Sequence, residues 1–272
     1  MSTFIDKLHA QWRRTRSLVC VGLDPELSRL PPVVAGRGGA IAAFNRAIID
    51  ATHDLVCAYK PQFAHYAAVG AEDQLAMTID YVKSTYPHIP VILDAKRGDV
   101  GSTATFYARE AFERYGADAV TVNPYLGGDS IAPFAEYADR GTFLLCRTSN
   151  AGGADLQECL VDGEPLYLRV ARMAAGAWNA HGNLGLVVGA TVPRTVGQVR
   201  AVVGDMPLLV PGVGAQGGDL AAAVALGRGR DGAGLIINAS RSVLYASAGP
   251  DFPEAARAAV ARMIADGACT AA

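Results

Sequence analysis

One short segment, residues 93–99, carries two carboxylates and an amine at a spacing that could do chemistry. Asp94 and Lys96 are two residues apart, and because side chains alternate across a strand, both should point to the same side. Lys60 ends another apolar run and can approach Asp94, whereas Asp99 lies past the strand on a loop. Carboxylates beside an ammonium keep it protonated even when it is partly buried. Such an ammonium can stabilise a carbanion and then protonate it.

The same residues could instead form an ion-pair network that only shapes the rim of the fold. For any one of them taken alone, that interpretation would be the better one. Two carboxylates and two amines converge here, however, and this favours a functional site. Residues 97–99 also match an adhesion motif, which we interpret as chance.

A second candidate site is the glycine-rich segment at residues 211–217, which contains a formal G-x-G-x-x-G pattern. A dinucleotide fingerprint should open the first strand–helix unit and be followed by an acidic residue, whereas this segment follows the seventh apolar run. Phosphate binding is a better interpretation than a dinucleotide site or plain turn glycines, because barrels commonly bind phosphate after strands seven and eight. The amides of residues 213–217 could face the anion, and Arg241 could add a bidentate contact.

Both segments follow short apolar, β-branched runs that recur along the chain. Each run is nearly continuous in hydrophobicity, as expected for parallel strands covered on both faces. The eight runs are residues 18–21, 55–59, 91–93, 119–122, 143–146, 184–188, 208–210 and 235–237. Helix-like stretches lie between them, for example residues 40–52, 71–86, 103–115, 166–181 and 220–226.

This eightfold alternation predicts a single (β/α)8 TIM-barrel domain of the α/β class over residues 1–272. The alternative is an open doubly wound sheet with a small second domain, but no proline- or serine-rich linker divides the chain. An inserted loop is expected around residues 154–165, and residues 267–272 are predicted to be a frayed tail. In a barrel, functional residues belong at the C-terminal ends of the strands, where both candidate segments fall.

Composition limits the classes of partner. The net charge is −2 and no extended basic run occurs, so we expect neither nucleic acid nor an anionic membrane as a partner. The five cysteines lack CxxC spacing, which favours free thiols in a reducing cytoplasm. The N-terminal residues lack the pattern of a signal peptide, and no apolar run approaches membrane-spanning length. The five histidines are scattered with no pair at ligand spacing, and lysine occupies a strand-end position where a metal site would need a carboxylate, so we predict no metal site.

Together, these motifs resemble the orotidine 5'-phosphate decarboxylase family over essentially the whole chain. The D-x-K-x-x-D pattern alone is shared with sugar-phosphate relatives, but the full set occurs in the right order and is specific. The matching positions are residues 22–24, Lys60, Asp94, Lys96, Asp99, Thr103, residues 211–217 and residues 240–241. The length and the segment after residues 147–153 resemble the longer bacterial subgroup, type 2. One departure is Ala151, where proline would be expected, but no functional group is lost.

The resemblance implies a cytoplasmic carboxy-lyase that converts orotidine 5'-phosphate to UMP without a cofactor. This is the last step of de novo pyrimidine nucleotide synthesis. Lys96 would stabilise and protonate a carbanion at C6 of the pyrimidine, with Asp94 and Asp99 flanking it. Lys60 would complete the catalytic set.

The resemblance also implies how substrate is bound and how chains assemble. Asp24, with Lys60, would bind the ribose hydroxyls, and Ser149 would bind the pyrimidine. The phosphate would be bound at the last two strand ends, by Pro211, Gly212, Val213, Gln216, Ser240 and Arg241. A homodimer is expected, in which Asp99 and Thr103 reach into the partner's site.

Two alternatives stay open, and a third is excluded. Sugar-phosphate relatives such as 3-keto-gulonate phosphate decarboxylase or hexulose phosphate synthase need a divalent metal and carry an acidic residue where this chain has Lys60. A barrel that senses a nucleotide without converting it would not need Lys96 held between two acids. A fused phosphoribosyltransferase domain is excluded, because the sequence has neither a second domain nor an acidic pyrophosphate-binding motif.

Overall fold

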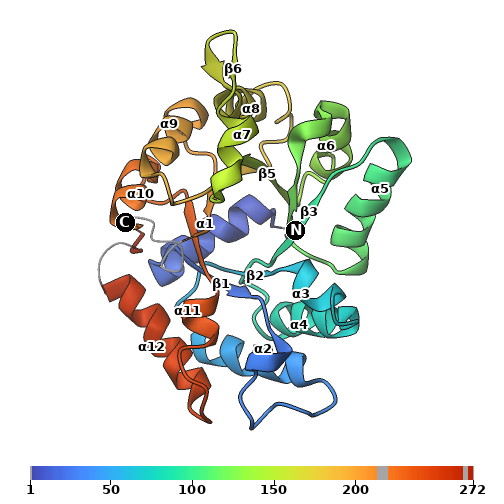
Figure 1. Cartoon of the computed structure of the whole chain (residues 1–272), viewed down its shortest axis with the longest axis vertical. Helices are drawn as coiled ribbons and strands as arrows, with labels where there is room; N and C mark the ends of the chain where they lie inside the picture. The colour runs from blue at the N-terminus through green and yellow to red at the C-terminus, as the bar shows by residue number, and fades with distance from the viewer. Residues whose placement is uncertain (1, 213–219, 266–268, 272) are drawn as a thin grey trace.

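Eight parallel strands form one sheet that curves round on itself in the computed structural model (Figure 1). The structure describes residues 2–212, 220–265 and 269–271. The strands are β1 (Val19–Leu23), β2 (Ala58–Pro61), β3 (Ile92–Arg97), β4 (Ala119–Val122), β5 (Gly141–Arg147), β8 (Leu184–Val188), β9 (Leu208–Val210) and β10 (Leu235–Ala239).

The order of the strands is β2-β1-β10-β9-β8-β5-β4-β3, and single bridges join Tyr59 to Val91 and Gln62 to Asp94. These bridges bring the two end strands together and close the barrel. The predicted (β/α)8 barrel is therefore confirmed, and the alternative of an open doubly wound sheet is wrong.

Most of the helices lie on the outside of the barrel, between successive strands (Figure 1). The helices are α1 (Phe4–Thr15), α2 (Ala40–Thr52), α3 (Phe63–Ala67), α4 (Glu72–Thr85), α5 (Gly101–Arg109), α6 (Gly128–Ala135), α7 (Ala154–Gln157), α8 (Leu166–Ala175), α9 (Pro193–Val203), α10 (Leu220–Gly227), α11 (Arg241–Leu244) and α12 (Phe252–Ala265). Of the described helices, none is long and apolar enough to cross a membrane.

The strands are covered on both faces, which accounts for their continuous apolar sequence. Every residue of β1, β8 and β10 is buried. In β3 burial falls toward the C-terminal end, where Lys96 and Arg97 emerge. Polar side chains therefore gather at the end of the barrel where the strands finish.

The opposite end of the barrel is covered by α1, which lies outside the strand–helix alternation. Lys7 pairs with Asp118 at 3.0 Å, and Gln11 donates to the carbonyl of Val56 at 2.9 Å. Both acceptors lie just before a strand begins. The helix thus closes the end of the barrel that is remote from the polar rim.

A glycine makes room for this helix at the start of β5. The rings of Phe4 and Phe143 meet edge to face, with centroids 5.7 Å apart. A Cβ atom at Gly141 would lie 2.4 Å from Phe4 Cδ1, much closer than a van der Waals contact. Position 141 therefore accepts only glycine, unless α1 moves.

Two predicted details are different in the structure. Residues 154–165, expected as a loop, contain α7 and a hairpin of β6 (Leu160–Val161) and β7 (Glu164–Pro165). The predicted frayed tail is wrong for residues 269–271. Ser17 forms an antiparallel bridge with Thr270, and Leu18 donates to the carbonyl of Cys269 at 2.8 Å. Cys269 is fully buried, because this short segment pairs with the chain just before β1.

We expect Gly141→Ala to lower the free energy of unfolding by about 1–3 kcal/mol, because the added methyl group overpacks the contact with Phe4. Urea unfolding followed by circular dichroism measures this difference.

Gly38→Ala is the matched control, because a Cβ at Gly38 meets nothing within 4 Å. We expect it to change stability by less than about 0.5 kcal/mol. Equal stability of the two variants would contradict the packing of α1 described above.

Candidate active site

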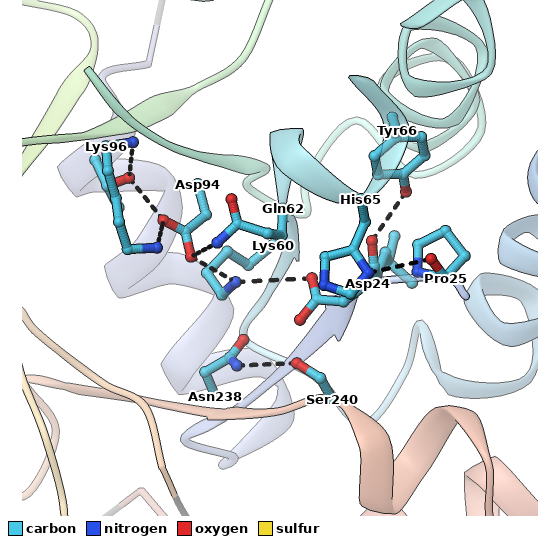
Figure 2. A network of polar contacts seen from close by, with 12 residues as sticks. Asp24, Pro25, Lys60, Gln62, His65, Tyr66, Asp94, Lys96, Asn238 and Ser240 are labelled. Atoms are coloured by element: carbon cyan, nitrogen blue, oxygen red, sulfur yellow. Dashed lines mark hydrogen bonds and ion pairs between the residues drawn. The ribbon is translucent and has the colours of Figure 1, made fainter. Parts of the chain in front are cut away.

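Asp94 is the centre of a polar network at the C-terminal ends of β2, β3 and β4 (Figure 2). The residue is only 7% exposed, and both of its carboxylate oxygens accept two hydrogen bonds. Oδ2 accepts from Lys60 Nζ at 2.9 Å and from Gln62 Nε2 at 3.0 Å. Oδ1 accepts from Lys96 Nζ at 2.7 Å and from Thr121 Oγ1 at 2.8 Å. A buried carboxylate with four donors is ionised and fixed in orientation.

The network continues from Lys60 to Asp24 at the end of β1. Lys60 Nζ lies 3.9 Å from Asp24 Oδ1, and the lysine side chain is 4% exposed. Asp24 Oδ1 is buried and has no hydrogen-bond partner among the described residues. Figure 2 shows the resulting chain of alternating charges, Asp24–Lys60–Asp94–Lys96.

The charges of this network shift the pKa values of its two central members, Asp94 and Lys60. Burial alone would raise the pKa of Asp94, but Lys60 and Lys96 outweigh it and hold that pKa well below its ordinary value. Burial alone would lower the pKa of Lys60, but Asp24 and Asp94 outweigh it and raise that pKa above its ordinary value. Both groups are therefore charged at neutral pH.

The backbone at Lys96 departs from a regular strand. Its φ is 47°, in the left-handed region that residues with a side chain rarely adopt. The register of β3 against β4 shifts between Leu93 and Arg97, and the Lys96 N–H donates to Thr121 Oγ1 at 2.9 Å. The side chains of Lys96 and Asp94 are in contact, which agrees with the expectation that they point the same way. The direction of the Lys96 side chain, however, is set by an irregularity in the strand.

A cavity of about 410 Å³ opens at this edge of the barrel. Its walls combine the charged network with the loop after β5 and the ends of β8, β9 and β10. The lining residues are Asp24, Lys60, Gln62, His65, Asp94, Lys96, Thr121, Leu145, Thr148, Ser149, Asn150, Val187, Leu209, Pro211 and Asn238. The volume and the mixed polar and apolar walls suit one small organic ligand.

Several predicted site residues lie in this cavity, and others do not. The structure brings Asp24, Lys60, Asp94, Lys96, Ser149 and Pro211 together in its walls. Asp99 lies beyond β3, and its carboxylate accepts only from its neighbour Val100 N–H, at 2.8 Å, among the described residues. Thr103 is exposed on α5. Neither Asp99 nor Thr103 lines the cavity of its own chain.

The predicted phosphate site is described in part. Gly212 has a φ of 91°, a conformation that favours glycine, whereas Val213 and Gln216 lie outside the described residues. Ser240 follows β10 and accepts from Asn238 Nδ2 at 3.2 Å, and Arg241 opens α11 with its side chain exposed.

Gly22 of β1 leaves room for Ser240 to lie beside Asn238. A Cβ atom at residue 22 would lie 2.0 Å from Ser240 Oγ and 3.1 Å from Asn238 Oδ1. Close approach of β1 and β10 at the rim therefore requires a glycine here.

Nine lining residues were not among the predicted site residues: Gln62, His65, Thr121, Leu145, Thr148, Asn150, Val187, Leu209 and Asn238. Gln62 and Asn238 stand in the polar segments that follow the apolar runs of the sequence, so their positions gave a signal. Thr121 lies inside an apolar run, and its role depends on which face of β4 points inward. His65 was set aside as an isolated histidine; its Nδ1 lies 3.1 Å from the carbonyl oxygen of Pro25.

Fold and site together define a (β/α)8-barrel protein with a charged, ligand-sized cavity at the C-terminal rim of its strands. The orotidine 5'-phosphate decarboxylase / HUMPS family model matches residues 17–259. The chain belongs to this family, and the predicted resemblance is confirmed.

Individual relatives agree with this assignment. The orotidine 5'-phosphate decarboxylase of Cellvibrio japonicus (strain Ueda107) is 62% identical over 258 residues, 94% of each chain. The solved structure of Leishmania donovani OMP decarboxylase has a TM-score of 0.83 and 39% identity, and the match covers 97% of this chain and 98% of that one. Leishmania donovani UMP synthase has a TM-score of 0.86 and 42% identity over 97% of this chain, which spans 56% of that longer protein.

We expect Asp94→Asn to destabilise the fold by about 3–5 kcal/mol at pH 7, because it leaves buried Lys60 without its closest carboxylate. Asp94 has a depressed pKa in the folded state, so its stabilising contribution is present above its ordinary pKa of 3.8 and is lost as the pH falls through the folded-state pKa. The difference in free energy of unfolding between wild type and variant should therefore be steady above about pH 5 and shrink below about pH 3.8. Urea unfolding at a series of pH values measures it.

Asp54→Asn serves as the control, because Asp54 forms an exposed ion pair with Arg257 at 2.6 Å. Loss of such a pair should cost less than about 1 kcal/mol. A similar small effect from Asp94→Asn would contradict the central role of the buried carboxylate.

Proposed function

We propose that this chain decarboxylates orotidine 5'-phosphate to UMP, as the last step of de novo pyrimidine nucleotide synthesis. One observation carries the proposal: Asp94 holds Lys96 at 2.7 Å on the cavity wall while it also contacts buried Lys60. The names of the relatives state the same activity for those proteins. Lys60 occupies the position where the metal-dependent sugar-phosphate relatives would carry an acidic residue, which favours the pyrimidine nucleotide.

The proposed chemistry assigns the proton to Lys96. When the bond between C6 and the carboxylate breaks, CO2 leaves and the electron pair stays on C6 as a carbanion with no adjacent electron sink. The side chain of Lys96 is 44% exposed and lines the cavity; its ammonium stabilises that charge and then donates a proton to C6. Asp94, together with Lys60, keeps this ammonium oriented before substrate arrives.

Repulsion between Asp94 and the substrate carboxylate contributes to the rate but is not the main effect. Two unit charges about 4 Å apart interact by roughly 4 kcal/mol at an effective dielectric constant near 20. Stabilisation of the carbanion by Lys96 must supply more, supported by binding energy from the remote phosphate.

The cavity supports an assignment of each part of the substrate. Asp24, whose Oδ1 has no hydrogen-bond partner among the described residues, and Lys60 would bind the ribose hydroxyls, and Ser149 would lie against the pyrimidine. The phosphate would be bound at the ends of β9 and β10, by Pro211, Gly212, Val213, Gln216, Ser240 and Arg241.

We further propose that the chain is one cytoplasmic domain that works as a homodimer. Asp99 and Thr103 do not line their own cavity, which supports their proposed place in the partner's site. Val100 and Phe106 lie beside them and are 52% and 63% exposed, an apolar surface suited to burial against a second copy.

Lys96→Ala should lower the turnover of orotidine 5'-phosphate by about 10³-fold or more, because both carbanion stabilisation and the proton donor are lost. Binding of UMP should persist. Loss of substrate absorbance measures turnover, and calorimetry measures UMP binding.

Lys83→Ala, on the outer helix α4, is the control and should turn over normally. The assay is run with and without EDTA, because a metal-dependent sugar-phosphate enzyme would lose activity with the chelator. Turnover by Lys96→Ala equal to that of wild type would refute the assigned proton donor. Absence of wild-type turnover, with UMP still bound, would favour a nucleotide sensor.

Co-expression of Lys96→Ala with Asp99→Ala should restore about a quarter of the wild-type activity, although each variant alone is inactive. Random pairing makes half of the dimers mixed, and each mixed dimer has one site with both Lys96 and Asp99 intact. If Asp99 served the site of its own chain, the mixture would stay inactive.

A further inference from the structure

The inserted segment, residues 154–165, does not line the cavity, but it is attached to a loop that does. Residues 148–150, which we call the β5 loop, follow β5 and line the cavity with all three residues. Gln157 ends α7 within the insertion and contacts the first residue of this loop, Thr148.

The carboxamide of Gln157 holds Thr148 at two points. Its Oε1 accepts from the Thr148 N–H at 2.9 Å, and its Nε2 donates to Thr148 Oγ1 at 2.9 Å. The Thr148 hydroxyl in turn donates to Asn150 Oδ1 at 2.6 Å. Hydrogen bonds therefore run without a break from the insertion to a side chain on the cavity wall, and each strengthens the next.

A second attachment lies beside the first. The guanidinium of Arg147, a residue that is 6% exposed, donates to Glu158 Oε1 through Nε at 3.0 Å and contacts it through Nη2 at 2.9 Å. Gly153 leaves space for both attachments, because a Cβ there would lie 2.6 Å from Arg147 Nη1 and 2.9 Å from Gln157 Oε1. The turn into α7 is thus fitted closely around the β5 loop.

The other side of the β5 loop rests on the end of β8. Thr191 Oγ1 donates to the carbonyl oxygen of Ser149 at 3.2 Å. A Cβ at Gly189 would lie 2.6 Å from Ser149 Cα, so the two backbones are in close contact. The loop is therefore held from two sides, by the barrel and by the insertion.

We propose that Gln157 is a positioning residue, through which the insertion holds the β5 loop in place to recognise the pyrimidine base. It acts through Thr148 and Asn150 and does not touch the substrate. This inference rests on the proposed function, because that function assigns the β5 loop to the base. Lys60, Asp94 and Lys96 belong to β2 and β3 and are independent of this attachment.

The test compares two ligands that differ by the base. UMP contains the pyrimidine, whereas ribose 5-phosphate lacks it but keeps the ribose and phosphate groups. Gln157→Ala should weaken UMP binding by about tenfold and change ribose 5-phosphate binding by less than about twofold, because only the base depends on the β5 loop. The KM for orotidine 5'-phosphate should rise by a similar factor, while kcat changes little.

Gln157→Glu provides a graded variant of the same length. The carboxylate of this variant still accepts from the Thr148 N–H but cannot donate to Thr148 Oγ1. The Thr148 hydroxyl can then donate to this carboxylate instead of to Asn150 Oδ1. Its effect on UMP binding should lie between those of wild type and Gln157→Ala. Asp155→Ala is the matched control, because Asp155 is exposed on the same helix and its side chain has no hydrogen bond to a described residue.

Unchanged UMP binding in Gln157→Ala would overturn the proposal, and so would equal weakening of both ligands, which would indicate a general loss of structure. Failure of the proposed function is distinguishable, because wild-type protein would then not decarboxylate orotidine 5'-phosphate at all. With wild-type turnover present, the ratio of the two ligand affinities tests Gln157 alone.

Discussion

A carboxylate withdrawn from water needs donors for both of its oxygens, and the rim of this barrel is arranged to supply them to Asp94. The donors come from three neighbouring strands: Lys60 and Gln62 at the end of β2, Lys96 on β3 itself, and Thr121 on β4. Parallel strands finish at the same edge, so this convergence follows from the topology. The same contacts contribute to stability, since removing one member would leave an uncompensated buried charge.

The alternating chain from Asp24 to Lys96 also prepares the site electrostatically. Because the carboxylates raise the pKa of Lys60 and the lysines depress that of Asp94, the charges are set before any ligand binds. Fixed charges in a water-poor site stabilise a developing charge without having to reorganise. The left-handed backbone at Lys96 has an energetic cost, which the surrounding contacts compensate, and such strain is commonly found at functional positions.

Much of the fold could be predicted from the sequence, because continuous apolar runs define buried parallel strands and polar residues after them mark the functional edge. Asp94 and Lys96 could be paired from strand periodicity, and Lys60 from its place at a strand end. Thr121 could not be found in this way, because a threonine in an apolar run gives no signal without knowledge of the inward face. The pairing of residues 269–271 with the chain before β1 was missed because it depends on contacts between distant segments.

The charged network and the β5 loop both line the cavity, but they are held in place in different ways. This difference separates the residues proposed for the chemistry from those proposed for recognition of the base. The charged network stands on strands whose positions are fixed by a continuous sheet and a buried core. The β5 loop rests on the end of β8 on one side and on the other is held by side-chain contacts with a separate insertion, in which a single carboxamide makes two hydrogen bonds. A hydrogen bond contributes about 1 kcal/mol, far less than the packing of a strand, so the β5 loop can be altered without disturbing the barrel. Under the proposed function, base recognition could therefore change through the insertion while the Asp94 network keeps its geometry.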